Sequence, residues 1–167
     1  SFAEYAAARE DKLAHKPANI SFEQAAVVGI SGGTALQALT AGRLQPGQQV
    51  LIIGASGGVG SYAVQLAKAA GAEVTGVAST GKVDLVTRLG ADRVVDYTRD
   101  NFADGVHHYD VILDNVGNRS LTEVRRVMSP NGIYVLIGGG GPDDNRWLGP
   151  LAGVIKAHLS TSVEPTQ

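Results

Sequence analysis

The chain has 167 residues, of which 44% are hydrophobic and 18% are charged, and its formal net charge at pH 7 is −2. This length and composition predict one globular unit with a sizeable core. The near-neutral charge favours neither a nucleic-acid partner nor an anionic membrane surface. The sequence contains no cysteine, which excludes disulfides and thiolate metal sites. No stretch is apolar enough to span a bilayer or patterned as a signal peptide, so we expect a cytoplasmic protein.

The first part of the chain predicts two short helices. Ser21 and Gln24 fit a capping box at the start of a helix over residues 22–28. Glycines 32 and 33 are expected to end it, and a second helix is predicted over residues 34–41.

The sequence VLIIGASGGVG at residues 50–60 has the pattern of a buried strand, a tight turn and the start of a helix. In such units the glycines let the backbone approach a phosphate, and the free N–H groups of the helix face a pyrophosphate. A second strand, predicted over residues 73–78, follows at the distance expected for a dinucleotide-binding unit. The pattern therefore predicts a dinucleotide site, with a tight turn that binds nothing as the alternative.

Strands and helices continue to alternate along the rest of the chain. Further strands are predicted at 93–96, 110–116 and 133–137, helices at 82–89, 120–128 and 147–159, a short helix or loop at 101–107, and a turn at 130–132. This alternation predicts an α/β fold of the Rossmann type, a doubly wound parallel sheet of about five strands. Ligands of such sheets bind outside the carboxyl ends of the strands.

The end of the second predicted strand favours one nicotinamide cofactor. Folds that bind NAD usually have Asp or Glu there to hold the ribose hydroxyls, whereas this chain has Ser79-Thr80-Gly81-Lys82. Ser79 and Thr80 could donate hydrogen bonds to a 2′-phosphate, and Lys82 could supply the opposite charge. We therefore predict NADPH rather than NADH. The alternative is a solvated loop with an ordinary surface lysine.

Several motifs, in their order along the chain, resemble those of the medium-chain dehydrogenase/reductase superfamily. They are GASGGVG at 54–60, VTGVAST at 74–80, LGAD at 89–92, VDY at 95–97, YDVILDNVG at 109–117 and RWLGP at 146–150. Within this superfamily the chain is most similar to the zinc-free quinone oxidoreductase branch, in which an alanine such as Ala55 opens the glycine motif.

The resemblance implies a set of residues that bind NADPH. It assigns the residues after the first strand to the pyrophosphate, those after the second and third strands to the 2′-phosphate and adenosine, and the remainder to the nicotinamide end. The expected cofactor-binding residues are Thr34, Ser56, Gly57, Gly58, Val59, Ser79, Thr80, Lys82, Tyr97, Asn115 and Gly138.

No residue of the chain stands out as a general acid. His107 and His108 precede the fourth predicted strand, so we expect them at the opposite rim of the sheet. Asp114 lies within that strand, and its side chain is expected to cap backbone N–H groups. The catalytic residues are therefore unassigned.

Zinc-dependent alcohol dehydrogenases of the superfamily have a cysteine ligand where this chain has Val28-Gly29-Ile30, so we expect no metal site. The resemblance also implies that residues 1–45 are the end of a catalytic domain with connecting helices. Residues 46–167 would then be the NAD(P)-binding Rossmann domain, and the chain would be part of a protein about twice as long. The resemblance also implies a sixth strand of the sheet that would begin beyond Gln167.

The expected function is the NADPH-binding domain of an oxidoreductase that transfers hydride from NADPH to a quinone or an α,β-unsaturated carbonyl. This part alone is expected to be inactive, because the substrate would bind between it and the catalytic domain. Two alternatives remain, a zinc-type alcohol dehydrogenase and an NADPH-binding protein with a structural or interaction role. An exposed edge strand would favour a homodimer.

Overall fold

A computed structural model describes residues 4–138, so the helix predicted at 147–159 and the RWLGP motif lie outside the described residues. The elements are η1 (Glu10–Lys12), α1 (Phe22–Ala41), β1 (Gln49–Ile53), α2 (Gly58–Ala69), β2 (Glu73–Ala78), η2 (Thr80–Lys82), α3 (Val83–Arg88), β3 (Arg93–Asp96), β4 (Tyr109–Asp114), α4 (Leu121–Arg126) and β5 (Met128–Leu136), where η denotes a 3₁₀ helix. The strands match the predicted positions to within one residue, except that β4 ends two residues earlier than predicted and β5 begins five residues earlier.

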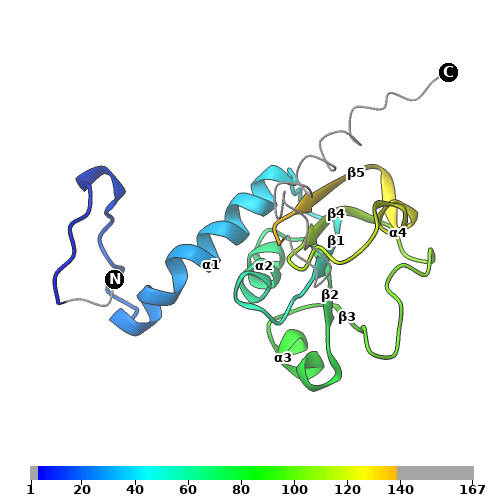
Figure 1. Cartoon of the computed structure of the whole chain (residues 1–167), viewed down its shortest axis with the longest axis horizontal. Helices are drawn as coiled ribbons and strands as arrows, with labels where there is room; N and C mark the ends of the chain where they lie inside the picture. The colour runs from blue at the N-terminus through cyan, green and yellow to red at the C-terminus, as the bar shows by residue number, and fades with distance from the viewer. Residues whose placement is uncertain (1–3, 139–167) are drawn as a thin grey trace, which may run out of the picture.

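The five strands form one parallel sheet in the order β3-β2-β1-β4-β5 (Figure 1). The central strand β1 pairs with β2 on one side and with β4 on the other. The strand order therefore reverses between β1 and β4, which is where ligands bind in open α/β sheets. The predicted Rossmann-type architecture is confirmed.

The sheet is covered on both faces, as the uninterrupted apolar run of β1 predicted. Alternate residues of β1 belong to two separate cores: Val50 and Ile52 pack under α1, α2 and α3, and Leu51 and Ile53 pack on the opposite face. Helix α4 and the segment around Phe102 cover that second face. These four side chains are buried, so β1 is held firmly and its carboxyl end is a fixed point.

The predicted break at glycines 32 and 33 is wrong, because residues 22–41 form the single helix α1. Its start is the predicted capping box, with the Ser21 hydroxyl accepting from the Gln24 N–H. A Cβ added to Gly32 would lie 3.2 Å from Val28 Cγ1 and 3.7 Å from Tyr62 of α2. Close packing of the two helices therefore offsets the helix-weakening effect of glycine.

The two halves of α1 have different surroundings. The second half buries Ala35, Ala38 and Leu39 in the core that also contains α2. The first half extends away from the sheet (Figure 1), and the exposed fractions of Phe22 and Ile30 are 79% and 83%. Only the second half of α1 is therefore an integral part of the Rossmann unit.

Two local predictions are revised, and at residues 101–107, where a short helix or a loop was expected, the structure has the loop. The expected turn at Pro130–Gly132 lies inside β5, where the pairing with β4 shifts register between Tyr109 and Val111. Helix α4 is shorter than predicted and begins at a capping box in which Ser120 Oγ accepts from the Glu123 N–H.

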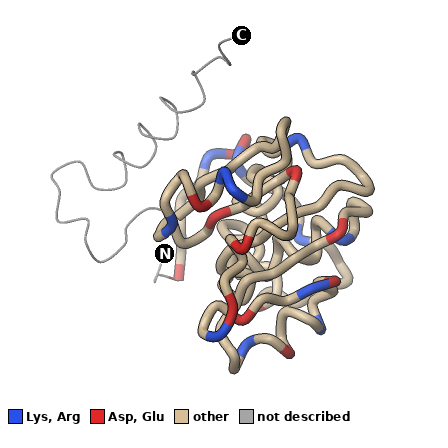
Figure 2. The backbone as a smooth tube through the Cα atoms, turned by 90° about the vertical axis from the view of Figure 1, so that its right-hand side faces the viewer, with Lys and Arg blue, Asp and Glu red and all other residues tan. Residues whose placement is uncertain are grey.

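Basic and acidic residues are interspersed along the backbone (Figure 2). Among the described residues, no helix combines the length and the apolar character that crossing a membrane requires.

Candidate dinucleotide-binding site

The turn between β1 and α2 is built on glycines that have no room for a side chain. Gly54 has a φ of +75°, in the left-handed region, and its carbonyl accepts from the Gly57 N–H at 3.1 Å. A Cβ added to Gly60 would lie 2.2 Å from the Gly54 oxygen and 2.8 Å from Ala55 Cα. The first turn of α2 therefore rests directly on the turn that precedes it, which is the helix–strand packing expected of the motif.

The start of α2 is available to an anion. Gly57 is the N-cap residue and provides no side-chain hydrogen bond to the helix. The first N–H groups of a helix lack partners within it, and the helix dipole adds partial positive charge at the same point. A phosphate group at this helix start would satisfy both.

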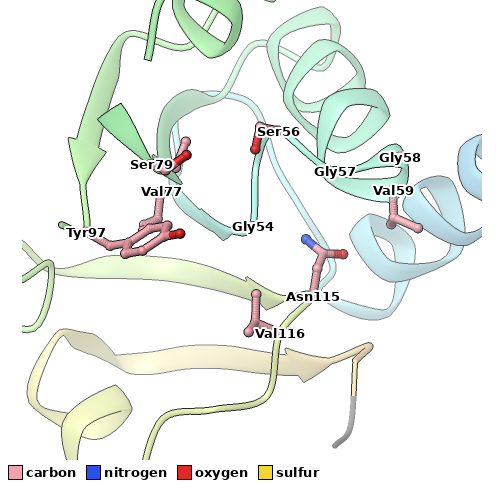
Figure 3. A pocket seen from close by; sticks show the side chains of 12 residues that line it. Gly54, Ser56, Gly57, Gly58, Val59, Val77, Ser79, Tyr97, Asn115 and Val116 are labelled. Carbon is pink, nitrogen blue, oxygen red and sulfur yellow. The ribbon is translucent and has the colours of Figure 1, made fainter. Parts of the chain in front are cut away.

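A hollow of about 420 Å³ lies along the carboxyl ends of the strands (Figure 3). Seven of the predicted site residues line it: Ser56, Gly57, Gly58, Val59, Ser79, Tyr97 and Asn115. Figure 3 shows Ser79 and Tyr97 toward one end of the hollow and Val59 and Asn115 toward the other, with Gly54 between them. Residues that lie up to 59 positions apart in sequence thus meet at one elongated site.

The other four predicted residues do not line this hollow. Lys82 is exposed in η2, beside the hollow, and its backbone N–H donates to the Ser79 oxygen at 2.8 Å. Thr34 is half-buried on α1, one turn after Ser31, whose Oγ would lie 2.9 Å from a Cβ added to Gly58. Helix α1 therefore borders the start of α2.

Gly138 and Thr80 each contact a neighbouring part of the chain, one through packing and the other through a hydrogen bond. A Cβ added to Gly138 would lie 2.1 Å from the Asn115 oxygen, so Gly138 packs directly behind the loop after β4. The Thr80 hydroxyl donates to Asp96 Oδ2 at 2.6 Å. This bond uses the hydroxyl hydrogen that the sequence interpretation assigned to a 2′-phosphate.

Asp114 caps backbone N–H groups, as predicted. It is fully buried, and its Oδ1 accepts from the N–H groups of Val116 and Gly117 at 2.9 and 2.8 Å. Its Oδ2 accepts from the Tyr134 hydroxyl at 2.9 Å, and burial followed by the charge of Asp114 raises the pKa of that phenol. Asp114 thus fixes the loop after β4 that borders the hollow.

Asn115 has one satisfied and one unsatisfied group. Its Nδ2 donates to the Ile53 oxygen at 2.8 Å. Its Oδ1 is buried and has no hydrogen-bond partner among the described residues. Leaving a buried acceptor unpaired costs about 1–3 kcal/mol, so this oxygen, in the wall of the hollow, is suited to a donor on a ligand.

A second, smaller hollow of about 190 Å³ adjoins the first and shares Tyr97 and Val116 with it. Its remaining wall includes Phe102 and Arg119, whose guanidinium carbon lies 5.1 Å from the centre of the Phe102 ring. Sequence reasoning did not identify these residues. Both lie in loops without a motif, and only the folded chain brings them together.

The histidines of the described residues lie away from this site. His107 and His108 are exposed and border a different hollow, at the amino ends of the strands, as predicted. His15 is exposed near the amino end of the described residues. No group of three or more His, Cys, Asp or Glu residues suited to a metal occurs within residues 4–138.

Comparison with known proteins extends this description. Residues 58–160 match the family described as zinc-binding dehydrogenase. The chain is 36% identical over 166 residues to 2-methylene-furan-3-one reductase of Solanum lycopersicum, covering 98% of this chain and 42% of that protein. It is 43% identical over 119 residues to the chloroplastic NADPH-dependent alkenal/one oxidoreductase of Arabidopsis thaliana, covering 70% of this chain and 31% of that protein.

Among solved structures, the quinone oxidoreductase from Coxiella burnetii matches with a TM-score of 0.74 and 30% identity. The match covers 89% of this chain and 44% of that one, so the chain spans less than half the length of the proteins compared here. The matched family covers most of the chain, and the sheet and glycine turn agree with it. The chain belongs to the zinc-binding dehydrogenase family, within the medium-chain dehydrogenase/reductase superfamily.

Proposed function

We propose that the chain binds NADPH along the carboxyl ends of its strands, as the cofactor-binding part of an oxidoreductase. The observation that carries this proposal is the hollow that joins the uncapped start of α2 to Ser79 and Tyr97. Its shape suits an elongated ligand with a central pyrophosphate. The unpaired Asn115 Oδ1 supports a ligand with a hydroxyl or amide donor at the end near Val59.

Each part of NADPH has residues of suitable chemistry. The pyrophosphate would lie at the N–H groups of Gly58 and Val59, since the Gly57 N–H already donates to the Gly54 oxygen. The adenine would enter the apolar hollow between Tyr97 and Phe102. The 2′-phosphate would lie near Ser79, with Lys82 as a cation. Thr34, Asn115 and Gly138 would lie toward the nicotinamide nucleoside.

Bound NADPH would supply a hydride to an electron-poor small molecule, and we propose a quinone or an α,β-unsaturated carbonyl as the acceptor. The names of the relatives, an alkenal/one oxidoreductase and a methylene-furanone reductase, support this substrate class. The chain's own contribution is to bind and orient the cofactor, because hydride chemistry belongs to the nicotinamide. Homodimerisation, a cytoplasmic location and the division at residue 45 remain predictions.

Calorimetric titration of the chain with NADPH and with NADH tests the binding proposal. We expect one site that binds NADPH at least tenfold more tightly than NADH, because a charge-assisted phosphate contact contributes about 1.5–3 kcal/mol. Absence of binding would contradict the proposal. Equal affinity for both cofactors would contradict the choice of NADPH.

Activity is tested on the natural polypeptide, by following NADPH oxidation with a panel of quinones and enones. Turnover on either class would support the reductase. Tight NADPH binding without turnover would favour a binding or structural role. Stoichiometric zinc by metal analysis would favour an alcohol dehydrogenase and contradict the zinc-free reductase.

A further inference from the structure

Asp96 is the last residue of β3 and is nearly buried, with 9% of its surface exposed. Its Oδ2 accepts from the Thr80 hydroxyl at 2.6 Å. Its Oδ1 accepts from both the N–H and the hydroxyl of Thr98, at 3.0 and 2.8 Å. The two threonine hydroxyl oxygens are themselves 2.9 Å apart, so the three side chains form one hydrogen-bonded cluster.

This cluster joins two loops that have no local connection in the sequence. Thr80 begins η2, in the loop after β2, between Ser79 and Lys82. Thr98 lies in the loop after β3, next to Tyr97. The Tyr97 N–H also donates to the Ala78 oxygen, at 3.1 Å. Holding Thr80 to Thr98 therefore fixes the separation between Ser79 and Tyr97, which together form one end of the hollow (Figure 3).

The charge of Asp96 is largely compensated within the cluster. A carboxylate near a 2′-phosphate site would repel a phosphate dianion if it were free. Here three hydrogen bonds from Thr80 and Thr98 stabilise the carboxylate, and Arg99 Nε lies 3.7 Å from Oδ2. The hydrogen bond from Thr80, followed by those from Thr98, holds the pKa of Asp96 below its ordinary value, so it stays ionised at neutral pH.

We propose that Asp96 is a positioning residue for cofactor choice: it ties Thr80 to Thr98 and so holds Ser79 and Lys82 at the 2′-phosphate. The inference rests on the proposed NADPH site and assigns Thr80 a different role from the one predicted. Thr80 acts through Asp96 on the shape of the phosphate site, and its hydroxyl does not donate to the phosphate.

The test measures the dissociation constants of the chain for NADPH and NADH by calorimetry in four variants. Asp96→Ala should weaken NADPH binding about tenfold and change NADH binding less than about threefold, because NADH lacks the phosphate that the cluster serves. Thr80→Val, which removes one hydroxyl and keeps the shape, should act in the same direction. Asp96→Asn retains hydrogen-bonding groups at both positions and should restore most of the NADPH affinity.

The matched control is Asp92→Ala, at the other end of β3. Asp92 also accepts a backbone N–H, that of Val74 at 2.7 Å, but it borders the hollow at the opposite rim. Its replacement should lower the melting temperature and leave the ratio of the two dissociation constants unchanged. If Asp96→Ala acted only by damaging the fold, Asp92→Ala should change the ratio of the two dissociation constants in the same way.

A double-mutant cycle then tests whether Asp96 acts through Lys82. The effects of Asp96→Ala and Lys82→Ala on NADPH affinity should be less than additive, because a misplaced lysine has less affinity left to lose. Equal weakening of NADPH and NADH by Asp96→Ala, or no change in either, would overturn the inference. A wild-type chain that binds NADPH and NADH equally would instead contradict the proposed function. That outcome is read from the wild type alone and does not depend on the variants.

Discussion

At the scale of single residues, the candidate site depends on close backbone packing that leaves no space for a side chain. Gly60 is the clearest case, because the space that its Cβ would need is filled by the backbone of Gly54 and Ala55. Backbone atoms cannot rotate away as a side chain can, so a substitution there must shift α2 relative to β1. Packing of α2 against the turn therefore requires glycine at position 60.

Gly60→Ala should lower the free energy of unfolding by about 3 kcal/mol or more, since overpacking typically costs 1–3 kcal/mol and here the contact is 2.2 Å. The same replacement at Gly33 is the control. Gly33 lies in α1, and nothing lies within 4 Å of the position of its Cβ. Gly33→Ala should therefore stabilise the chain by about 0.5–1 kcal/mol. Urea unfolding measures both, and equal effects would contradict the packing argument.

Lys82→Ala tests the residue that was predicted to carry the cofactor preference. The variant should bind NADPH about 10–100-fold more weakly and NADH almost unchanged, because only NADPH has the phosphate that the ammonium would neutralise. Calorimetric titration with each cofactor measures the two affinities. Equal loss for both would show that Lys82 does not contact the 2′-phosphate.

The sequence predicted the capping role of Asp114 but not the hydrogen-bond partner of Thr80. A carboxylate at a strand end, followed by small loop residues, caps the nearest N–H groups, and these are close in sequence. The partner of Thr80 is Asp96, sixteen residues away. Their hydrogen bond exists because β2 and β3 pair side by side, which no local pattern specifies.

At the scale of elements, strands were predicted more accurately than helix boundaries. Strands β1, β2 and β4 have apolar runs that are almost wholly buried, which leaves little choice of position. Strand β5 has no fully buried residue, and its start was mispredicted by five residues. Helix α1 was predicted as two helices because glycines 32 and 33 weaken a helix locally. Contact with Tyr62 of α2 reverses that preference, and such a tertiary contact cannot be predicted from the local sequence.

The carboxylate of Asp92, just before β3, accepts hydrogen bonds from Lys68 Nζ of α2 and from the Val74 N–H of β2. It therefore connects three parts of the fold. The hydrogen bond from Lys68, the largest cause, holds the pKa of Asp92 below its ordinary value of about 3.9. A carboxyl group whose pKa is lowered by folding stabilises the fold above its unfolded pKa, and this contribution is lost as the pH falls through the folded value.

Asp92→Asn should therefore lower the melting temperature at pH 7 and make it less sensitive to acid between about pH 4 and pH 2. Because both side chains are partly exposed, the ion pair itself should contribute about 1 kcal/mol or less. Melting curves of the wild type and the variant across this range measure the effect. A difference between the two proteins that stays constant down to pH 2 would contradict it.

At the scale of the whole molecule, the order of the strands makes the site. Because all strands are parallel, the loops after β1, β2, β3 and β4 lie at one edge of the sheet, and the reversal of strand order between β1 and β4 opens a crevice there. The alternation of strands and helices predicted that edge, and seven of the eleven predicted residues line the hollow there. The adjoining hollow at Phe102 and Arg119 was not predicted, since its walls come from irregular loops.

The most direct test of the proposed site is an NMR titration of the isotopically labelled 167-residue chain with NADPH, read from the backbone amide signals. We predict that the largest shifts occur at residues 56–60, Ser79, Tyr97 and Asn115, and that His107 and His108 at the opposite rim do not respond. Shifts centred on that opposite rim, or no shifts at saturating NADPH, would contradict the proposal that this hollow holds the cofactor.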